Sequence, residues 1–125
     1  VYIQLPNGRK IAYVSPEIVD GKICFMGLNQ TTRQWQVIET WGGKITENVI
    51  QAIARDCLCE TLLRLEKCGY SPVMHVHDEV ICEVPEDASD RCLEGLEAIM
   101  GQSPEWTPEL VLTADGFISK YYKKD

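Results

Sequence analysis

The longest periodic pattern in this 125-residue chain is helical, and it constrains the fold more than any other feature. Apolar residues recur at spacings of three and four, namely Val49, Ile50, Ile53, Ala54, Cys57, Leu58, Leu62 and Leu65. That spacing places them on one face of an α-helix. Thr46 is a candidate N-cap with Glu47 in the first turn, and Gly69 stands where a left-handed residue would end the helix. The pattern therefore predicts a long amphipathic helix between Thr46 and Gly69.

Two strand pairs are predicted before this helix. Residues 2–5 and 10–14 flank Asn7-Gly8, which is a strong hairpin signal. Residues 22–28 and 34–40 form a second pair, joined by the polar stretch 29–33. Gly42-Gly43 then interrupts the strand pattern ahead of the helix.

A third hairpin is predicted after the helix, at residues 74–84. Two apolar runs enclose a short polar segment in which Asp78 lies near the turn and Glu79 follows it. A carboxylate at a hairpin tip has a fixed backbone beneath it and open space in front of it. A divalent metal that must also touch a substrate needs that arrangement, so the hairpin is a candidate metal platform.

The last third of the chain predicts a second helix and an extended tail. Pro85 and Asp87 open the helix, and its apolar face consists of Leu93, Leu96, Ile99 and Met100. Residues 109–117 are expected to form a last strand or extended segment, followed by a basic end at 120–124. This order lacks βαβ alternation. It predicts an α+β fold in one domain, residues 1–125, with antiparallel hairpins or sheet and helices packed on one face.

Composition excludes several classes of protein. The hydrophobic fraction of 45% and the charged fraction of 25% are typical of a soluble globular protein. No apolar run approaches membrane-spanning length and no signal-peptide pattern opens the chain, so a cytoplasmic location is the default expectation and no membrane partner is expected. The chain starts at Val1 without Met, in strand-like sequence, which suggests a cut point within a longer protein. The six cysteines fall inside apolar patterns and are expected to be reduced.

Four motifs occur together in one order. They are Leu5-Pro6-Asn7-Gly8-Arg9; Trp41-Gly42-Gly43-Lys44 followed by residues 47–56; His77-Asp78-Glu79; and Asp115-Gly116-Phe117 through Tyr121-Tyr122-Lys123. In this order and spacing the chain resembles the C-terminal palm segment of the family A (DNA polymerase I-like) DNA polymerases, phage-type branch. The resemblance extends over nearly the whole chain.

The resemblance implies a role for each candidate residue. Asp78 would be the third-motif metal ligand and Glu79 its helper, in a two-Mg²⁺ site for template-directed nucleotidyl transfer in DNA replication. Gln51 would probe the minor groove, and His77 would lie near the primer terminus. The phosphate contacts would come from basic side chains, namely Arg9, Lys44 and Arg55.

The resemblance also implies partners that lie outside the chain. These are primer-template DNA, deoxynucleoside triphosphates and the rest of the polymerase chain. The family's first-motif Asp and the Lys of its fingers helix do not occur in these residues, so the isolated chain is expected to be inactive. The net charge of −7 argues against a free-standing nucleic-acid binder, but suits the acidic, metal-holding part of a larger protein.

Other readings of the same residues stay open. Acidic residues often occupy turns because they are solvated, and the same applies to exposed histidine, glutamine and basic side chains on strands and helices. A non-catalytic remnant or interaction domain could keep this fold. His75-x-His77-Asp78 is similar to the start of the zinc hydrolase motif H-x-H-x-D-H, but the trailing histidine is missing and a third protein ligand would be needed.

Overall fold

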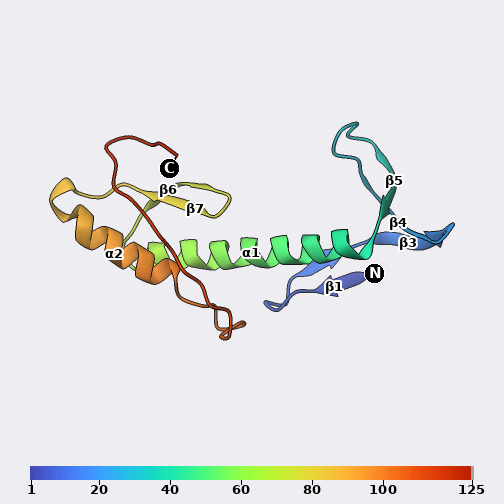
Figure 1. Ribbon diagram of the computed structural model, residues 1–125, viewed down its shortest axis with the longest axis horizontal. Helices are drawn as coiled ribbons and strands as arrows, with labels where there is room; N and C mark the ends of the chain where they lie inside the picture. Colours follow the sequence, from blue (N-terminus) through green and yellow to red (C-terminus); the bar gives the residue numbers. More distant parts are fainter. Residues whose placement is uncertain (125) are drawn as a thin grey trace. The chain divides into compact units, whose positions relative to one another are not determined.

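A computed structural model describes residues 1–124 and has the predicted α+β class, with antiparallel sheets and two α-helices (Figure 1). The chain divides into two compact units, Val1–Ala54 and Arg55–Asp125. Helix α1 (Gly42–Lys67) begins in the first unit and continues into the second. The strands form three small sheets, of two, three and two strands. The assignment of residues 1–125 to a single domain stays a prediction.

The first hairpin pairs β1 (Tyr2–Gln4) with β2 (Lys10–Ala12), as predicted. Its connection is longer than the two-residue turn that Asn7-Gly8 suggested, and runs from Leu5 to Arg9. The Leu5 N–H donates to the Arg9 carbonyl at 2.7 Å and the Gly8 N–H to the Leu5 carbonyl at 2.9 Å. Gly8 has φ 89°, a conformation that glycine adopts without a Cβ clash.

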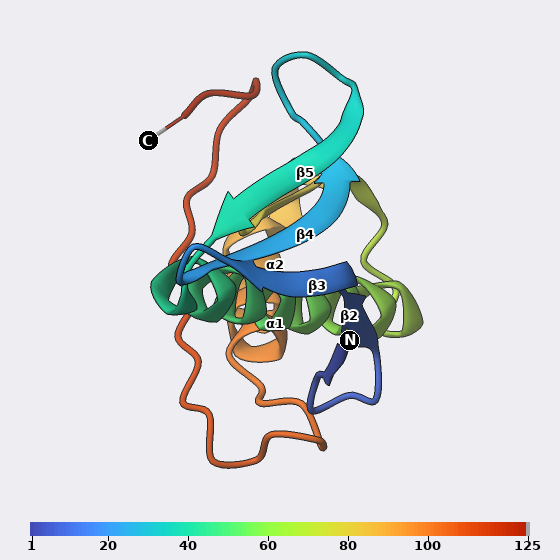
Figure 2. The same ribbon diagram turned by 90° about the vertical axis from the view of Figure 1, so that its right-hand side faces the viewer.

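The second sheet has three strands in the order β3-β4-β5, with β4 in the middle (Figure 2). The predicted pair is confirmed as β4 (Lys22–Leu28) and β5 (Trp35–Thr40). Strand β3 (Val14–Val19) was not predicted, although Asp20-Gly21 is a hairpin signal. Their φ values of 50° and 77° are those of a turn in which both central residues are left-handed, and this matches the twist of the flanking strands.

The core of the first unit lies where these strands meet the start of α1. Leu5, Tyr13 and Cys24 are buried, and the Tyr13 and Phe25 rings pack edge-to-face with centroids 5.0 Å apart. The Asn48 amide donates to the Tyr13 hydroxyl at 3.1 Å, which satisfies the polar end of the buried ring.

Helix α1 begins at Gly42, so the prediction that Thr46 caps it was wrong. Thr46 lies inside the helix, where its hydroxyl donates to the Gly42 carbonyl at 3.0 Å. A Cβ on Gly43 would lie 3.1 Å from the indole nitrogen of Trp41. The glycine therefore leaves room for the Trp41 ring against the first turn, and does not interrupt the helix.

The end of α1 matches the prediction at Gly69, whose φ is 86°. The Tyr70 N–H donates to the Leu65 carbonyl at 3.0 Å and the Gly69 N–H to the Glu66 carbonyl at 3.1 Å. These two bonds form a Schellman motif, which satisfies carbonyls that the helix end leaves unpaired. The chain therefore reverses sharply and enters the next hairpin.

The second unit contains β6 (Pro72–Val76), β7 (Glu79–Cys82), a 3₁₀ turn η1 (Glu86–Ala88) and α2 (Ser89–Met100). The predicted hairpin and second helix are thus confirmed. Strand β6 lies against α1, because Leu62 and Leu63 line the same shallow apolar groove as Val73 and Met74. Leu65 of α1 is completely buried. From residue 101 to 124 the described chain forms turns and irregular segments with no strand.

Within the described residues there is no disulfide bond, and all six cysteines are free thiols. No helix within residues 1–124 is both long enough and apolar enough to cross a membrane.

Candidate metal and nucleic-acid site

The β6–β7 hairpin holds His77 and Asp78 in a two-residue turn. Val76 pairs with Glu79, His75 with Val80 and Met74 with Ile81, which fixes the register up to the turn. His77 has φ 54°, in the left-handed region that histidine tolerates better than most residues. Non-glycine residues in this region are uncommon and are concentrated at functional sites. The backbone beneath Asp78 is therefore tightly defined.

The two candidate metal ligands differ in their surroundings. Asp78 is exposed at the hairpin tip, whereas Glu79 is the first residue of β7 and is half-buried. Their carboxylate oxygens are hard ligands of the kind that Mg²⁺ prefers. Mg²⁺ is usually bound by one or two protein carboxylates together with water and substrate phosphates. The donor set at this turn therefore fits a magnesium ion that also contacts a substrate.

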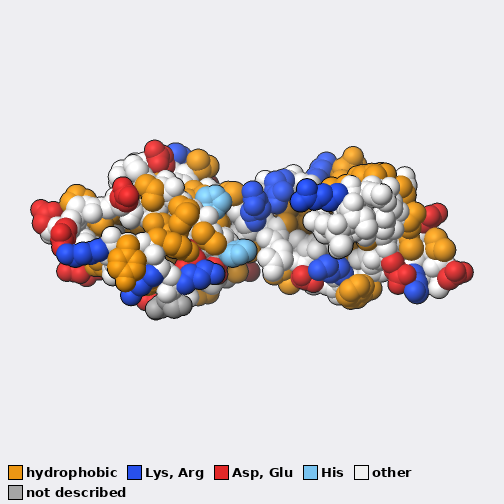
Figure 3. Space-filling model, turned by 90° about the horizontal axis from the view of Figure 1, so that it is seen from above, with side chains coloured by type: hydrophobic (Ala, Val, Ile, Leu, Met, Phe, Trp, Pro, Cys, Tyr) orange, Lys and Arg blue, Asp and Glu red, His pale blue; other side chains and the backbone are white. Residues whose placement is uncertain are grey.

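Both histidines are exposed, and Figure 3 shows them in pale blue beside hydrophobic side chains. His75 is on β6 and His77 in the turn. Within residues 1–124 no three His, Cys, Asp or Glu side chains are grouped so that they could hold a metal ion. The described residues thus do not assemble the three-ligand zinc site that the partial H-x-H-x-D-H motif would require.

The candidate DNA contacts outside the hairpin lie on α1 and on the first turn of the chain. Gln51 and Arg55 are exposed and are separated by about one helical turn. The Lys44 ammonium lies 3.0 Å from both carboxylate oxygens of Glu47, and the two side chains are 44% and 55% exposed. Such a pair contributes little in water, so Lys44 can exchange Glu47 for a phosphate. Arg9 is exposed in the β1–β2 connection.

The structure brings together only part of the predicted set. His77, Asp78 and Glu79 share one hairpin of the second unit, to which Arg55 also belongs. Arg9, Lys44 and Gln51 belong to the first unit.

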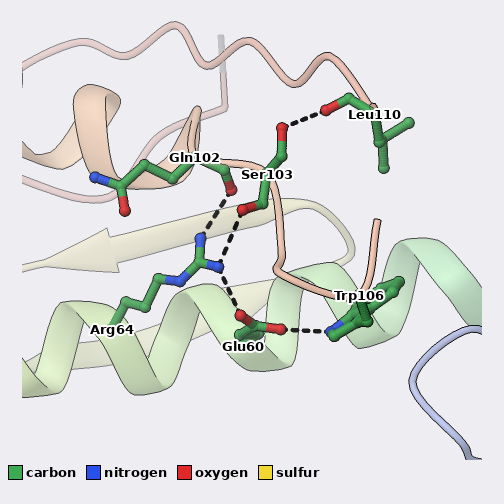
Figure 4. Close-up of polar contacts among 6 residues, drawn as sticks. All are labelled: Glu60, Arg64, Gln102, Ser103, Trp106 and Leu110. Carbon is green, nitrogen blue, oxygen red and sulfur yellow. Dashed lines mark hydrogen bonds and ion pairs between the residues drawn. The ribbon is translucent and has the colours of Figure 1, made fainter. Parts of the chain in front are cut away.

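A polar network that the sequence did not reveal is centred on Glu60 and Arg64 of α1 (Figure 4). The Arg64 guanidinium lies 2.6 Å from Glu60 and donates to the carbonyls of Gln102 and Ser103 at 2.8 and 3.3 Å. The Trp106 indole N–H donates to the other Glu60 oxygen at 2.6 Å. We call these contacts the Glu60 clamp. It holds the chain after α2 against α1.

One sequence signal could have indicated half of this clamp. Glu60 and Arg64 are four residues apart, a spacing at which a glutamate and an arginine pair along a helix. No pattern identifies Trp106 as the second partner, because the contact spans 46 residues of chain.

Two cysteines near these elements are poor nucleophiles. Burial, followed by the nearby Glu60 and Asp56 carboxylates, raises the pKa of the Cys57 thiol, and burial alone raises the pKa of Cys82. Both thiols therefore stay protonated at neutral pH, which argues against a thiolate-based mechanism at this site.

The chain is similar to parts of two phage proteins. It is 45% identical over 130 aligned residues to the DNA polymerase of Bacillus phage SP02, in an alignment that covers 100% of this chain and 20% of that protein. It is 32% identical over 54 residues to the DNA polymerase of Mycobacterium phage L5, covering 42% of this chain and 9% of that protein. The chain thus spans about a fifth of the length of the first relative. No family model matches it, and no solved structure matches it.

Proposed function

We propose that this chain is the C-terminal palm segment of a family A DNA polymerase of the phage type, in which Asp78 is a ligand of the catalytic Mg²⁺. The observation that carries the proposal is the Asp78 turn itself. An exposed carboxylate stands on a two-residue turn of fixed register, next to a half-buried second carboxylate. The similarity to a phage DNA polymerase along the whole chain supports the same reading.

The hairpin contributes rigidity to the proposed site. The strand pairing that closes the turn and the left-handed φ of His77 fix the backbone from which the Asp78 side chain extends. Preorganisation of this kind matters because a small misplacement of a reacting group lowers the rate sharply. Magnesium, when bound, would activate the attacking hydroxyl and neutralise charge on the triphosphate.

Glu79 has a supporting role in this proposal. It is the half-buried first residue of β7, directly after the turn that carries the exposed Asp78. A second carboxylate on the neighbouring residue strengthens the attraction for a cation. Loss of the Glu79 charge should lower activity less than loss of the Asp78 charge.

Residues on α1 would contact the nucleic acid. Gln51 is exposed, and its amide can donate to the acceptors that every base pair presents in the minor groove, so it can sense pair geometry without reading sequence. Arg55, Lys44 and Arg9 are cationic and would meet phosphates, which positions the DNA without specifying it.

By itself the chain is proposed to be inactive. Two adjacent carboxylates give magnesium a weak and largely hydrated site, and two ions cannot be held in register for an in-line displacement without further ligands. The partners needed for activity are therefore the remainder of a polymerase chain, primer-template DNA and deoxynucleoside triphosphates.

The test is primer extension by a full-length polymerase that carries this segment. Asp78→Asn keeps the side-chain size and removes the charge, so incorporation should fall by about two to three orders of magnitude, the loss typical of a removed catalytic electrostatic group. Asp87→Asn is the matched control, because Asp87 is an exposed aspartate in η1, away from the turn. Near-normal incorporation by Asp78→Asn would refute the proposal.

A further inference from the structure

The end of the chain carries aromatic rings that face solvent. Tyr121 is 73% exposed, Tyr122 50% and Phe117 43%. Isolated exposed apolar residues are ordinary, but three exposed rings close together in sequence offer several aromatic faces to a ligand.

Cations alternate with these rings. Lys120, Lys123 and Lys124 lie in the same segment, and no acidic residue occurs between Gly116 and Lys124. The segment is therefore locally positive in a chain whose formal net charge is −7. We call residues 117–124 the aromatic-basic segment.

The lysines of this segment are available to bind a phosphate group of a ligand. The Lys123 ammonium lies 5.3 Å from the centroid of the Phe117 ring, so a cation and a ring face are already adjacent. Lys120 lies 3.2 Å from Glu86, but both side chains are 85% exposed. Exposed pairs of this kind contribute little in water and exchange readily for a phosphate.

The residue just before the aromatic-basic segment, Gly116, is anchored to α2. The Gly116 N–H donates to the Glu97 carboxylate of α2 at 2.8 Å, and a Cβ on Gly116 would lie 2.7 Å from a methyl carbon of Leu93. The backbone at Gly116 is thus pressed directly onto α2. Earlier in the chain, the Glu60 clamp ties residues 102–106 to α1. This anchoring lowers the entropy that the segment would lose on binding a ligand.

From these contacts we infer that the aromatic-basic segment is a contact site for single-stranded DNA, in which the rings stack on bases and the lysines meet phosphates. Alternating rings and cations are the means by which proteins hold single strands without reading their sequence. Duplex DNA fits less well, because its base faces are already stacked. The inference deepens the proposed polymerase function by naming a contact for an unpaired strand, although the binding itself requires no catalysis.

The test is fluorescence anisotropy of a labelled oligothymidylate with the 125-residue chain at low ionic strength and in the presence of EDTA. Tyr121→Ala should weaken binding at least about fivefold, since each base–ring stack contributes that much or more. Tyr2→Ala is the matched control, because Tyr2 is 71% exposed and lies at the other end of the chain. An equal loss in both variants, or no binding by the wild-type chain, would overturn the inference.

Salt dependence tests the role of the lysines. If all three meet phosphates, the logarithm of the affinity should fall against the logarithm of salt concentration with a slope of about −2, and each Lys→Ala change at 120, 123 or 124 should reduce the slope by about 0.7. Lys22→Ala and Lys67→Ala should leave it unchanged. Equal slopes in all five variants would overturn the inference, as would duplex binding as tight as single-strand binding.

The two proposals fail separately in this design. EDTA removes any metal, so Asp78→Asn should bind the oligothymidylate as the wild-type chain does. Loss of binding in Asp78→Asn would contradict the assignment of the contact to the aromatic-basic segment. Failure of the polymerase proposal would appear in primer extension and would leave this binding assay unchanged.

Discussion

Arg64→Met should loosen the chain after α2 by removing the centre of the Glu60 clamp. Methionine keeps much of the aliphatic stem but loses the ion pair to Glu60 and the bonds to the Gln102 and Ser103 carbonyls. A hydrogen bond to a charged group contributes about 1.5–3 kcal/mol when it is buried. The Arg64 and Glu60 side chains are 21% and 29% exposed, and the Ser103 bond is long, so we expect a total loss of about 2–3 kcal/mol.

Urea unfolding followed by tryptophan emission measures this loss. Trp35 and Trp41 are 60% and 64% exposed, so a red shift on unfolding reports mainly on the half-buried Trp106 of the clamp. With an m value of about 2 kcal/mol/M the midpoint should fall by roughly 1 M. Arg91→Met is the control, because Arg91 is exposed on α2.

A difference between the two variants below about 0.5 kcal/mol, the ordinary range of surface substitutions, would refute the argument that the clamp holds this segment. A double-mutant cycle refines the result. Glu60→Met and Trp106→Phe should show a coupling energy of about 1 kcal/mol, because the hydrogen bond from the Trp106 indole to Glu60 is lost in either single variant.

Three further outcomes are expected. In a full-length polymerase, Gln51→Ala should change extension from mismatched primer ends more than from matched ends, with little dependence on the correct base pair, and an equal effect on every primer would indicate a scaffolding role. Alkylation with iodoacetamide at mildly alkaline pH should modify the exposed Cys59 and Cys68 before Cys57 and Cys82, whose raised pKa values keep their thiols protonated, as peptide mass spectrometry would show. The purified chain should give a cooperative unfolding transition yet extend no primer with magnesium or manganese, and template-dependent extension would contradict the proposed incompleteness of its metal site.

Local patterns predicted the elements whose signal lies within a few residues. The apolar spacing along α1, the left-handed Gly69, the β4–β5 pair and the hairpin around Asp78 were all visible in the sequence, because each depends on near neighbours. Strand β3 was missed even though Asp20-Gly21 marks its turn.

Contacts that depend on tertiary packing could not be predicted from local sequence patterns. The start of α1 at Gly42 depends on how the Trp41 ring lies against Gly43, and the Glu60 clamp depends on a tryptophan far along the chain. The candidate site was likewise predictable only where its residues are neighbours in the sequence. His77, Asp78 and Glu79 are contiguous and fall in one hairpin, whereas the roles of Gln51, Arg55, Lys44 and Arg9 depend on DNA and on other parts of a polymerase. Those roles stay predictions.

Iron-directed cleavage can show whether Asp78 binds the metal, because it locates the ion without relying on activity. In a full-length polymerase that carries this segment, Fe²⁺ would replace Mg²⁺, and ascorbate with peroxide would generate radicals that cut the backbone next to the bound ion. We expect cleavage at residues 77–79 that is suppressed by excess Mg²⁺ and lost in Asp78→Asn but kept in Asp87→Asn. Cleavage that spares this turn, or that persists unchanged in Asp78→Asn, would contradict the assignment of Asp78 as a metal ligand.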